Sequence, residues 1–353
     1  MKLSSFGSLC GRSIAFTMAE ILLSLTIIGV VAAITLPSLT GNINERTWNT
    51  QRKALYSRLS QAFSLIDNIR GYGKLVTVKE KNEWGDDAEY DTGNAAETFL
   101  SGGLSKVLKL NNICDSTHIS DCGMPDQIVD LVGSKVNVAR SSEITRLSGL
   151  HNAYSYYGCA GFKIDGDAAA FETANGESVM FWYNPLCLDS NSAFKMVGGY
   201  VPATSAMCAN FLYDLNGKKG PNTVGKDVGF ITVFYPADSV VVAPLPMSKN
   251  IGTGLSVSEA SKACSAQAED LRLPNKEEML SMGLNSKFIG GGFPESDLNY
   301  LTSSYTDANT RSGGEEWGGL STRSFVYLND STYGAMLWVK SKTTKGAGRC
   351  IKR

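Results

Sequence analysis

The chain is poor in histidine and has no excess of charge of either sign. It contains 2 histidines among 353 residues, and its 33 basic residues nearly balance its 34 acidic residues. Proteins that bind nucleic acid through the phosphate backbone usually carry an excess of positive charge, which is missing here. The sequence also has no Gly-x-Ser-x-Gly segment, no phosphate-binding glycine loop and no histidine cluster. We therefore predict no nucleic-acid partner, no catalytic residue and no enzymatic activity.

The longest apolar run lies near the N-terminus, between Phe16 and Leu39, and it contains a single acidic residue, Glu20. A helix of about twenty apolar residues spans the ~30 Å hydrocarbon core of a bilayer. A charge at the centre of such a helix costs roughly 2.5–3.5 kcal/mol, so an acid near its start needs an explanation. Two interpretations are open. The helix is either a plain signal anchor whose Glu20 reaches the interface, or a helix whose acid pairs with a partner in an assembly.

The segment before this run, residues 1–15, is short, polar and basic, and it has no apolar core of its own. An ordinary secretory signal has its cleavage site after the apolar run, following small residues. Here the small residue Ala15 precedes the run, so cleavage between Ala15 and Phe16 would leave the helix on the mature protein. A lipoprotein signal at Cys10 is disfavoured, because no apolar stretch precedes that cysteine.

The motif Phe16-Thr-Met-Ala-Glu20 behind a short basic leader resembles the class III leader of type IV pilins and type II secretion pseudopilins. In that family the leader ends in Gly or, less often, Ala, and a Phe-Thr-Leu-x-Glu motif and about twenty apolar residues follow. Pro37 lies where many type IV pilins have a helix-kinking proline, and Gly29 lies at another recurrent position. Ala15 in place of Gly and Met18 in place of Leu are the two departures.

The resemblance implies that a prepilin peptidase cleaves between Ala15 and Phe16 and methylates the new amino group. It also implies that Glu20 meets the N-terminal ammonium of a neighbouring subunit, which would make the buried acid tolerable and select the register. Pro37 removes one helical hydrogen bond and Gly29 weakens the helix, so the stretch between them is expected to bend or melt during packing. The expected partners are other pilin or pseudopilin subunits, the prepilin peptidase and the inner membrane.

Seven cysteines lie beyond the leader, and their spacings match no zinc-binding signature. Disulfides formed outside the cytoplasm explain them better. The sequence alone does not fix the connectivity. We predict the pairs Cys114–Cys122, Cys187–Cys208 and Cys264–Cys350, with Cys159 either free or part of a different pairing.

The N-terminal helix is expected to continue to residue 70. Apolar residues recur at helical spacing in its second half, and Gly71-Tyr-Gly73 provides a glycine stop. This stripe predicts packing on a globular head, because the pattern does not sustain the heptads of a coiled coil. The stripe consists of Trp48, Leu55, Leu59, Ala62, Phe63, Ile66 and Ile69.

Residues 71–247 are expected to form a β-rich head of the pilin type. Short helices are predicted between Glu89 and Leu110, and a hairpin over Phe171–Tyr183 is predicted to turn at Asn175-Gly176. Further strands are predicted over 208–214, 230–235 and 240–244.

The loop from Asp214 to Asp227 is the segment richest in oxygen ligands. Major pseudopilins carry a calcium loop near their C-terminal strands, and hard cations bind several carboxylate, amide and backbone oxygens. The spacing lacks the terminal bidentate Glu of an EF-hand, and Asn, Gly and Pro also explain the loop by turn chemistry. We predict no cofactor, with calcium as the alternative. Its ligands would be Asp214, Asn216, Asn222 and Asp227.

The region 248–353 contains Arg272-Leu-Pro274 with Glu277 and Glu278, then Tyr300–Ser304, and finally Arg349–Lys352. In these segments it resembles the domain known as Lcl C-terminal, which is distantly C-type-lectin-like. Helices are predicted from Ser256 to Cys264 and from Asp270 to Leu280, with Pro274 near the first turn of the second helix. Proteins with this scaffold serve adhesion and sugar binding, among other functions.

The loop from Gly290 to Trp317 is the candidate binding surface of this C-terminal region. Trp317 or Tyr305 would stack on a sugar or on a partner surface. The alternative is that Trp317 fills the core of the module, which is the more common role of a tryptophan.

The predicted fold class is α+β. A long N-terminal transmembrane and amphipathic helix packs on a β-rich pilin head, and a lectin-like α+β module follows. The predicted domains are the leader 1–15, the helix 16–70 with its transmembrane part 16–39, the head 71–247 and the C-terminal module 248–353.

These features predict a structural minor subunit of a type IV pilus or type II secretion pseudopilus from a diderm bacterium. A bulky head suits a filament tip better than a repetitive shaft. The precursor would lie in the inner membrane, and the mature protein in a periplasmic or extracellular filament. The alternative is a membrane-tethered adhesin or carbohydrate-binding surface protein that does not polymerise, with a surface glycan as its partner. Glu20 would have no role in such an anchor.

Overall fold

The computed structural model describes residues 17–70, 77–78, 90–91, 95–138, 168–183, 201–202, 207–234, 240–290, 299–306, 322–330, 334–341 and 345–352. The contacts divide the chain into two compact units, residues 1–50 and residues 51–353. Helices and sheets occur together, as the predicted α+β class requires.

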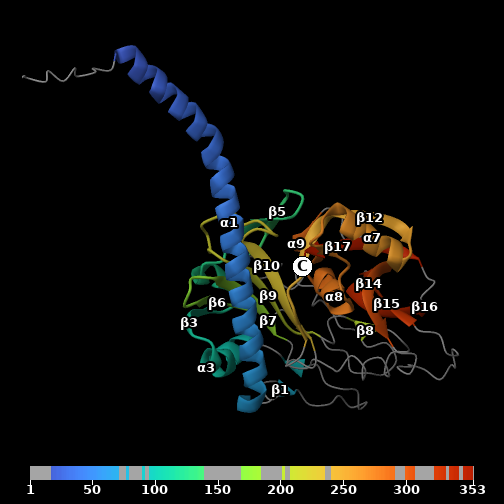
Figure 1. The fold of residues 1–353 in the computed structure, drawn as a ribbon. Coiled ribbons are helices and arrows are strands. Elements are labelled where there is room, and N and C mark those ends of the chain that lie inside the picture. The colour runs from blue at the N-terminus through green and yellow to red at the C-terminus, as the bar shows by residue number, and fades with distance from the viewer. Residues whose placement is uncertain are drawn as a thin grey trace, which may run out of the picture. The chain divides into compact units, whose positions relative to one another are not determined.

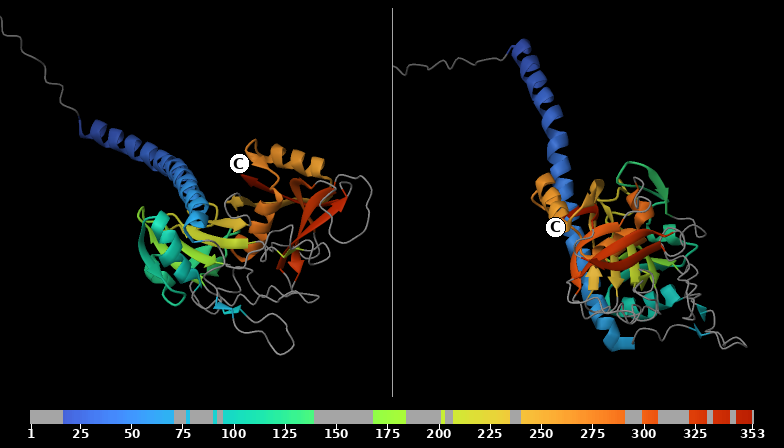
Figure 2. Two further views of the ribbon diagram at one scale, coloured as in Figure 1. Left: turned by 90° about the horizontal axis from the view of Figure 1, so that it is seen from below. Right: turned by 90° about the vertical axis from the view of Figure 1, so that its right-hand side faces the viewer.

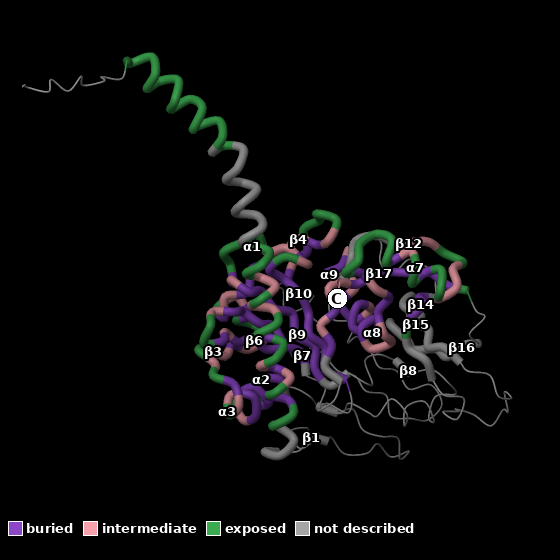
Figure 3. The backbone as a smooth tube through the Cα atoms, viewed as in Figure 1, coloured by how far each residue is buried: buried purple, intermediate pink, exposed green. Residues whose placement is uncertain are grey.

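Helix α1, Met18–Arg70, runs through both units. Gly29 and Pro37 lie inside this unbroken helix. Within the described residues, no helix has a stretch that is both long and apolar enough to cross a membrane. The described apolar side chains of its first part are exposed (Figure 3). They are Met18, Ile21, Leu22, Leu23, Leu25, Ile27, Ile28, Val30 and Val31.

The part of α1 in the second unit packs one face on a six-stranded sheet (Figures 1 and 2). Leu55, Leu59 and Phe63 have no exposed surface, and the ring of Phe63 meets the ring of Phe211 edge-on at 5.5 Å. These buried positions recur every four residues, which confirms this part of the predicted apolar stripe. Each buried Leu or Phe side chain contributes about 1.5–3 kcal/mol, so the stripe holds this part of the helix on the sheet.

The sheet under α1 is antiparallel and has the strand order β11-β10-β9-β7-β6-β3. The predicted hairpin at Asn175-Gly176 is confirmed, since β6 and β7 pair on either side of that turn. The predicted strands near 208–214, 230–235 and 240–244 correspond to β9, β10 and β11. The bounds are β3 Leu110–Cys114, β6 Ala168–Thr173, β7 Ser178–Tyr183, β9 Met207–Asp214, β10 Val228–Phe234 and β11 Val240–Val242.

Short helical turns lie before β3 and between β3 and β6 of this sheet. The predicted helical region ends earlier than Leu110, because Leu108 is already extended and Leu110 begins β3. Phe99 stacks between Phe63 and Phe181, with ring centroids 5.9 and 5.6 Å away. The elements are α2 Ala95–Phe99, the π-helical turn η1 Leu100–Leu104, α3 Ser105–Val107 and the 3-10 turn η2 Ile119–Cys122.

Two small hairpins complete this part of the chain. Strand β1, Thr77–Val78, pairs with β2, Tyr90–Asp91. Strand β4, Gln127–Val129, pairs with β5, Lys135–Asn137. Val129 also forms a bridge with Thr223 in the β9–β10 connection, so the second hairpin contacts that loop.

The C-terminal region forms a seven-stranded sheet of order β12-β17-β14-β15-β16-β8, with β13 paired to β17. Strand β8, Val201–Pro202, comes from the sequence of the predicted head and pairs with β16. The other bounds are β12 Leu245–Leu255, β13 Leu271–Arg272, β14 Asn299–Thr306, β15 Thr322–Asp330, β16 Gly334–Ser341 and β17 Gly346–Lys352.

The described residues of this region include the helices α7 Val257–Gln267, α8 Lys276–Leu284 and α9 Ser286–Ile289. The first predicted helix is confirmed, and Ser256 and Glu259 form its capping box. The predicted start of the second helix at Asp270 is wrong, because the next two residues form β13. Asn275 is the N-cap of α8 and forms a capping box with Glu278, so Pro274 lies directly before the cap, near the first turn as predicted.

Both faces of the central strands are buried. All seven residues of β10 are buried (Figure 3). Phe181 and Phe211 stack at 4.8 Å on the face that carries α1. On the other face, Trp182 and Phe230 share a buried cluster with Met279 of α8. The segments 71–247 and 248–353 thus share one core and one compact unit, and the boundary at 247/248 stays a prediction.

Candidate assembly site and candidate binding loops

The candidate assembly site is the first turn of α1, where Thr17 and Glu20 cap the helix together. The backbone N–H and the hydroxyl of Thr17 both donate to Glu20 Oε2, each at 2.8 Å. The Glu20 N–H donates to Thr17 Oγ1 at 3.3 Å. This reciprocal pair is a capping box, which satisfies backbone donors that a helix start otherwise leaves free. The sequence interpretation missed it, although the Thr-x-x-Glu spacing signals it.

The capping box occupies one of the two carboxylate oxygens of Glu20. In the part of the chain that the structure describes, both hydrogen bonds that this carboxylate accepts go to Oε2. A cation could therefore still bind at Oε1. Ala15 and Phe16, the predicted cleavage junction, lie outside the described residues, so the cleavage stays a prediction.

Gly29 and Pro37 are the two positions expected to weaken the helix. A Cβ at Gly29 would have no neighbour within 4 Å, so no close contact requires glycine there. The side chain of Pro37 is not among those described. Both residues lie inside α1, and a bend or local melting during packing stays a prediction.

The four predicted calcium ligands lie in the β9–β10 connection, and most of their oxygens already accept hydrogen bonds. The two oxygens of Asp227 accept the N–H groups of Asn222 and of the next residue, at 2.9 and 2.8 Å. Asn222 Oδ1 accepts a loop N–H at 2.9 Å, and Asp214 Oδ1 accepts the N–H of Asn216 at 3.0 Å. Asn222 has a φ of 48°, a left-handed conformation that Asn tolerates in turns.

The remaining oxygens, Asp214 Oδ2 and Asn216 Oδ1, are buried and have no hydrogen-bond partner in the described part of the chain. Burial raises the pKa of Asp214 to about 7, and the nearby Asp227 carboxylate adds to this effect.

The side-chain oxygens of this loop can be compared with those that a calcium ion requires. Calcium takes roughly six to eight oxygens, which include backbone carbonyls and waters, and among the four predicted ligands only Asp214 Oδ2 and Asn216 Oδ1 accept no hydrogen bond from the described residues. Among the described residues, no group of three or more His, Cys, Asp or Glu side chains could hold a metal ion. The hydrogen bonds of the turn hold these side chains in place, and calcium stays the alternative that the sequence raised.

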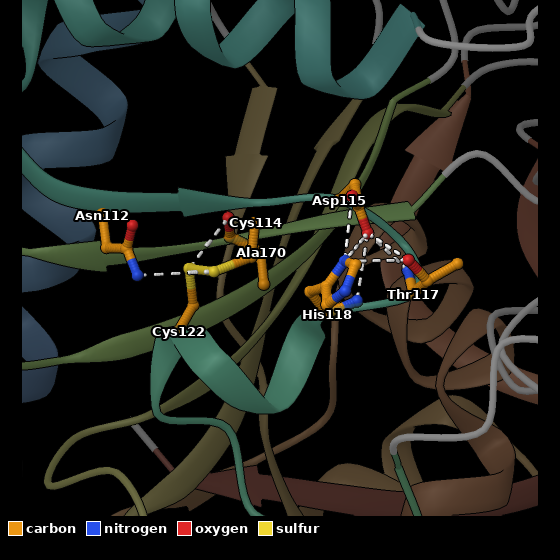
Figure 4. Close-up of polar contacts among 7 residues, drawn as sticks. All are labelled: Asn112, Cys114, Asp115, Thr117, His118, Cys122 and Ala170. Carbon is orange, nitrogen blue, oxygen red and sulfur yellow. Dashed lines mark hydrogen bonds and ion pairs between the residues drawn. A yellow bond between two sulfur atoms is a disulfide. The ribbon is translucent and has the colours of Figure 1, made fainter.

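Two of the three predicted disulfides are present in the structure. Cys114 is bonded to Cys122 with a Cα–Cα distance of 6.0 Å, and Cys264 is bonded to Cys350 with a Cα–Cα distance of 5.6 Å. Figure 4 shows the first bond between β3 and η2, with Cys122 Sγ 3.5 Å from the carbonyl oxygen of Ala170. The first bond closes a short loop, and the second ties α7 to β17.

Figure 4 also shows an exposed acid–base pair in the first disulfide loop. His118 Nδ1 lies 2.9 and 3.0 Å from the two carboxylate oxygens of Asp115, and the hydroxyl of Thr117 donates to the same carboxylate at 2.6 Å. The hydrogen bonds from Thr117 and His118 lower the pKa of Asp115 to about 2. In turn, the Asp115 carboxylate raises the pKa of His118 above its ordinary value of 6.5. His118 is thus a partner of Asp115 in a turn.

The residues that carry the lectin-like resemblance have structural roles. Arg272 donates to both carboxylate oxygens of Glu278, at 2.8 and 2.6 Å. Glu278 in turn accepts the N–H of Asn275 at 2.7 Å and so completes the cap of α8. Tyr300 has no exposed surface, and Arg349 is buried. These motif residues therefore build the helix start and the core.

Several predicted site residues lie outside the part of the chain that the structure describes. Cys159, Cys187 and Trp317 are outside the described residues, and the side chains of Cys208 and Tyr305 are not described. The third disulfide and the candidate sugar-binding loop therefore stay predictions.

No family model, no curated protein and no solved structure matches this chain.

Proposed function

We propose that this chain is a structural filament subunit of the type IV pilus or type II secretion pseudopilus kind, cleaved by a prepilin peptidase and assembled through its N-terminal helix. The observation that carries the proposal is Glu20, one carboxylate at the start of a helix whose described apolar side chains are exposed. A short basic leader ends at Ala15, before this helix. We propose no enzymatic activity.

The exposed apolar side chains in the first part of α1 require an apolar environment. Leu22, Leu23 and Ile28 have 61%, 63% and 63% of their surface exposed. Leaving such surface in water costs about 25 cal/mol per Å². The inner membrane would cover these side chains in the precursor, and the helices of neighbouring subunits would cover them in a filament. Because both environments are apolar, the helix could pass from one to the other without exposing this surface.

Glu20 would make the transfer of the helix from the membrane to the filament selective for one register between subunits. An unpaired carboxylate is costly in lipid, and the Thr17 cap satisfies only Oε2. The N-terminal ammonium of a neighbouring subunit would supply a cation at Oε1. A charge pair in an apolar environment is tolerated only when its geometry is good, so the pair would select one register between subunits.

The size of the C-terminal part favours a minor subunit at the filament tip. Shaft subunits repeat closely and need small heads, whereas residues 51–353 form one large compact unit. A tip position leaves room for this bulk. A surface glycan is the candidate ligand of the C-terminal region.

Mass spectrometry of the mature N-terminal peptide tests the proposal. We expect N-methyl-Phe16 as the first residue in cells with an active prepilin peptidase, and an intact leader in a peptidase-deficient strain. Ala15→Gly restores the commoner residue of the resembling family and should be cleaved at least as completely. An intact leader in the peptidase-positive strain, or a different first residue, would refute the proposal and favour a membrane-tethered adhesin.

A further inference from the structure

A buried polar cluster joins the six-stranded sheet to helix α8. Asn210 on β9 and Asn285 at the end of α8 each donate an amide N–H to the carbonyl oxygen of the other, at 2.9 and 3.1 Å. Thr232 on β10 donates its hydroxyl to Asn210 Oδ1 at 2.8 Å and lies 2.6 Å from Ser281 Oγ. All four residues have 0% of their surface exposed. The cluster is therefore a set of polar groups that satisfy one another inside the protein.

The surroundings of this cluster are apolar. Trp182 and Phe230 of the sheet share one buried cluster with Met279, Met282 and Phe288 of α8 and α9. Apolar contact is non-directional and methionine side chains adapt their shape, so this interface alone would tolerate several positions of α8 on the sheet. The reciprocal amide pair forms in only one position, because both donors and both acceptors must face each other.

Displacement of α8 from this position would leave the polar groups buried without hydrogen-bond partners. A buried amide or hydroxyl that loses its partner has also lost its hydrogen bonds to water. A slide of one helical turn, about 5.4 Å, exceeds the length of any hydrogen bond in the cluster. The cluster therefore selects among positions that apolar packing alone would leave similar.

A second contact fixes the chain just after α9. The N–H of Leu131 in the β4–β5 turn donates to the carbonyl oxygen of Ile289 at 3.4 Å. Gly290 follows with a φ of 69°, and a Cβ there would overlap the carboxylate of Asp130. Asp130 is itself held by two N–H groups of its own turn, at 3.0 and 2.7 Å. This contact lies outside the polar cluster and supports the same position.

We infer that the Asn210–Asn285 pair holds the C-terminal region on the sheet in a single position, and we call this pair the docking key. The surface involved is the face of β9 and β10 opposite α1, and its partner is α8 of the same chain. The C-terminal region is then a rigid extension of the head and not a hinged arm. The consequence rests on the proposed function: in a filament subunit, a ligand of this region would be held at a fixed place on the head.

Spin labels at two exposed positions, Gln61 of α1 and Lys262 of α7, report the pose in the purified full-length chain. The cysteines outside the three predicted disulfides are replaced by serine. Pulsed electron paramagnetic resonance should then give one narrow distance distribution. In the double variant Asn210→Leu/Asn285→Leu, which removes the key without leaving an orphan amide, the distribution should broaden or split.

The single variants Asn210→Leu and Asn285→Leu each leave one buried amide without its hydrogen-bond partner. The urea concentration at which half of the protein is unfolded should therefore be lower for each single variant than for the double variant. Asn44→Leu makes the same change at an exposed position of α1 and should leave the distance and the midpoint unchanged. An unshifted, narrow distance in the double variant would overturn the inference, as would a broad distribution before substitution. The measurement uses the isolated chain, so its failure is distinct from a failure of filament assembly.

Discussion

Arg58 of α1 is the side chain whose removal has the best-defined effect on stability. It donates to Glu177 at the start of β7, and only 3% of the Glu177 side chain is exposed. The hydroxyl of Thr173 donates to the same carboxylate. Asn175, with its amide oxygen turned toward α1, accepts two further bonds from the guanidinium at 3.1 and 3.3 Å. Arg58 therefore balances a buried charge and ties α1 to the β6–β7 turn.

The variant Arg58→Met keeps an apolar stem and leaves Glu177 buried without its counter-ion. Removal of one partner of a buried ion pair costs about 3–5 kcal/mol. Because 27% of the Arg58 side chain is exposed, water weakens the pair, and we expect a loss of about 2–3 kcal/mol in the free energy of unfolding. The double variant Arg58→Met/Glu177→Gln removes the stranded charge and should regain about 1 kcal/mol of that loss.

Urea unfolding of the purified protein, followed by circular dichroism, measures these differences. Lys53→Met changes an exposed residue of the same helix and should alter the free energy of unfolding by no more than about 0.5 kcal/mol. If Arg58→Met behaved like this control, the ion pair would not stabilise the head. A double variant less stable than Arg58→Met would contradict the role assigned to the buried charge.

A disulfide, an exposed histidine and the β9–β10 loop each provide a further test. Peptide mapping without reduction should recover Cys264 and Cys350 in one linked species. This bond spans 86 residues and stabilises the fold by roughly 4–5 kcal/mol through chain entropy. Recovery of Cys264 with another partner would contradict the assigned disulfide. Asp115→Asn should lower the NMR titration midpoint of His118 toward 6.5, and an unchanged midpoint would count against the pair. Because the pKa of His118 is raised and that of Asp115 is lowered to about 2, this pair stabilises the fold between pH 3.8 and 6.5, and it loses its effect as the pH rises through the raised pKa of His118 or falls through that of Asp115. A calcium chelator should leave the melting temperature unchanged, because the loop holds itself by hydrogen bonds, and a fall of several degrees would instead support calcium.

Local signals in the sequence predicted much of the fold. The four-residue spacing of Leu55, Leu59 and Phe63 gave the buried face of α1. The Asn175-Gly176 pair between two apolar runs gave the β6–β7 hairpin. Each of these signals lies within a few residues of the structure it specifies, so no knowledge of distant contacts was needed.

The features that the sequence-based predictions missed or misplaced are of two kinds, local ones and ones that depend on distant contacts. The Thr17–Glu20 cap is signalled by the local Thr-x-x-Glu spacing, but the prediction gave Glu20 only an assembly role. The late start of α8 arises from β13, which exists because it pairs with β17, a distant strand. The Asn210–Asn285 pair joins residues 75 positions apart, and no local pattern identifies such a contact.

Incorporation of Glu20→Ala into sheared filaments tests the central proposal most directly. Thr26→Val is the matched control, because it removes a hydroxyl that donates to the Leu22 carbonyl oxygen of the same helix and leaves Glu20 in place. We predict that both variants reach the membrane, since loss of the charge does not hinder insertion. Thr26→Val should enter filaments normally, whereas Glu20→Ala should be strongly depleted from them. Glu20→Ala in filaments at the level of the unchanged protein would contradict the assembly role and leave the helix as a simple anchor.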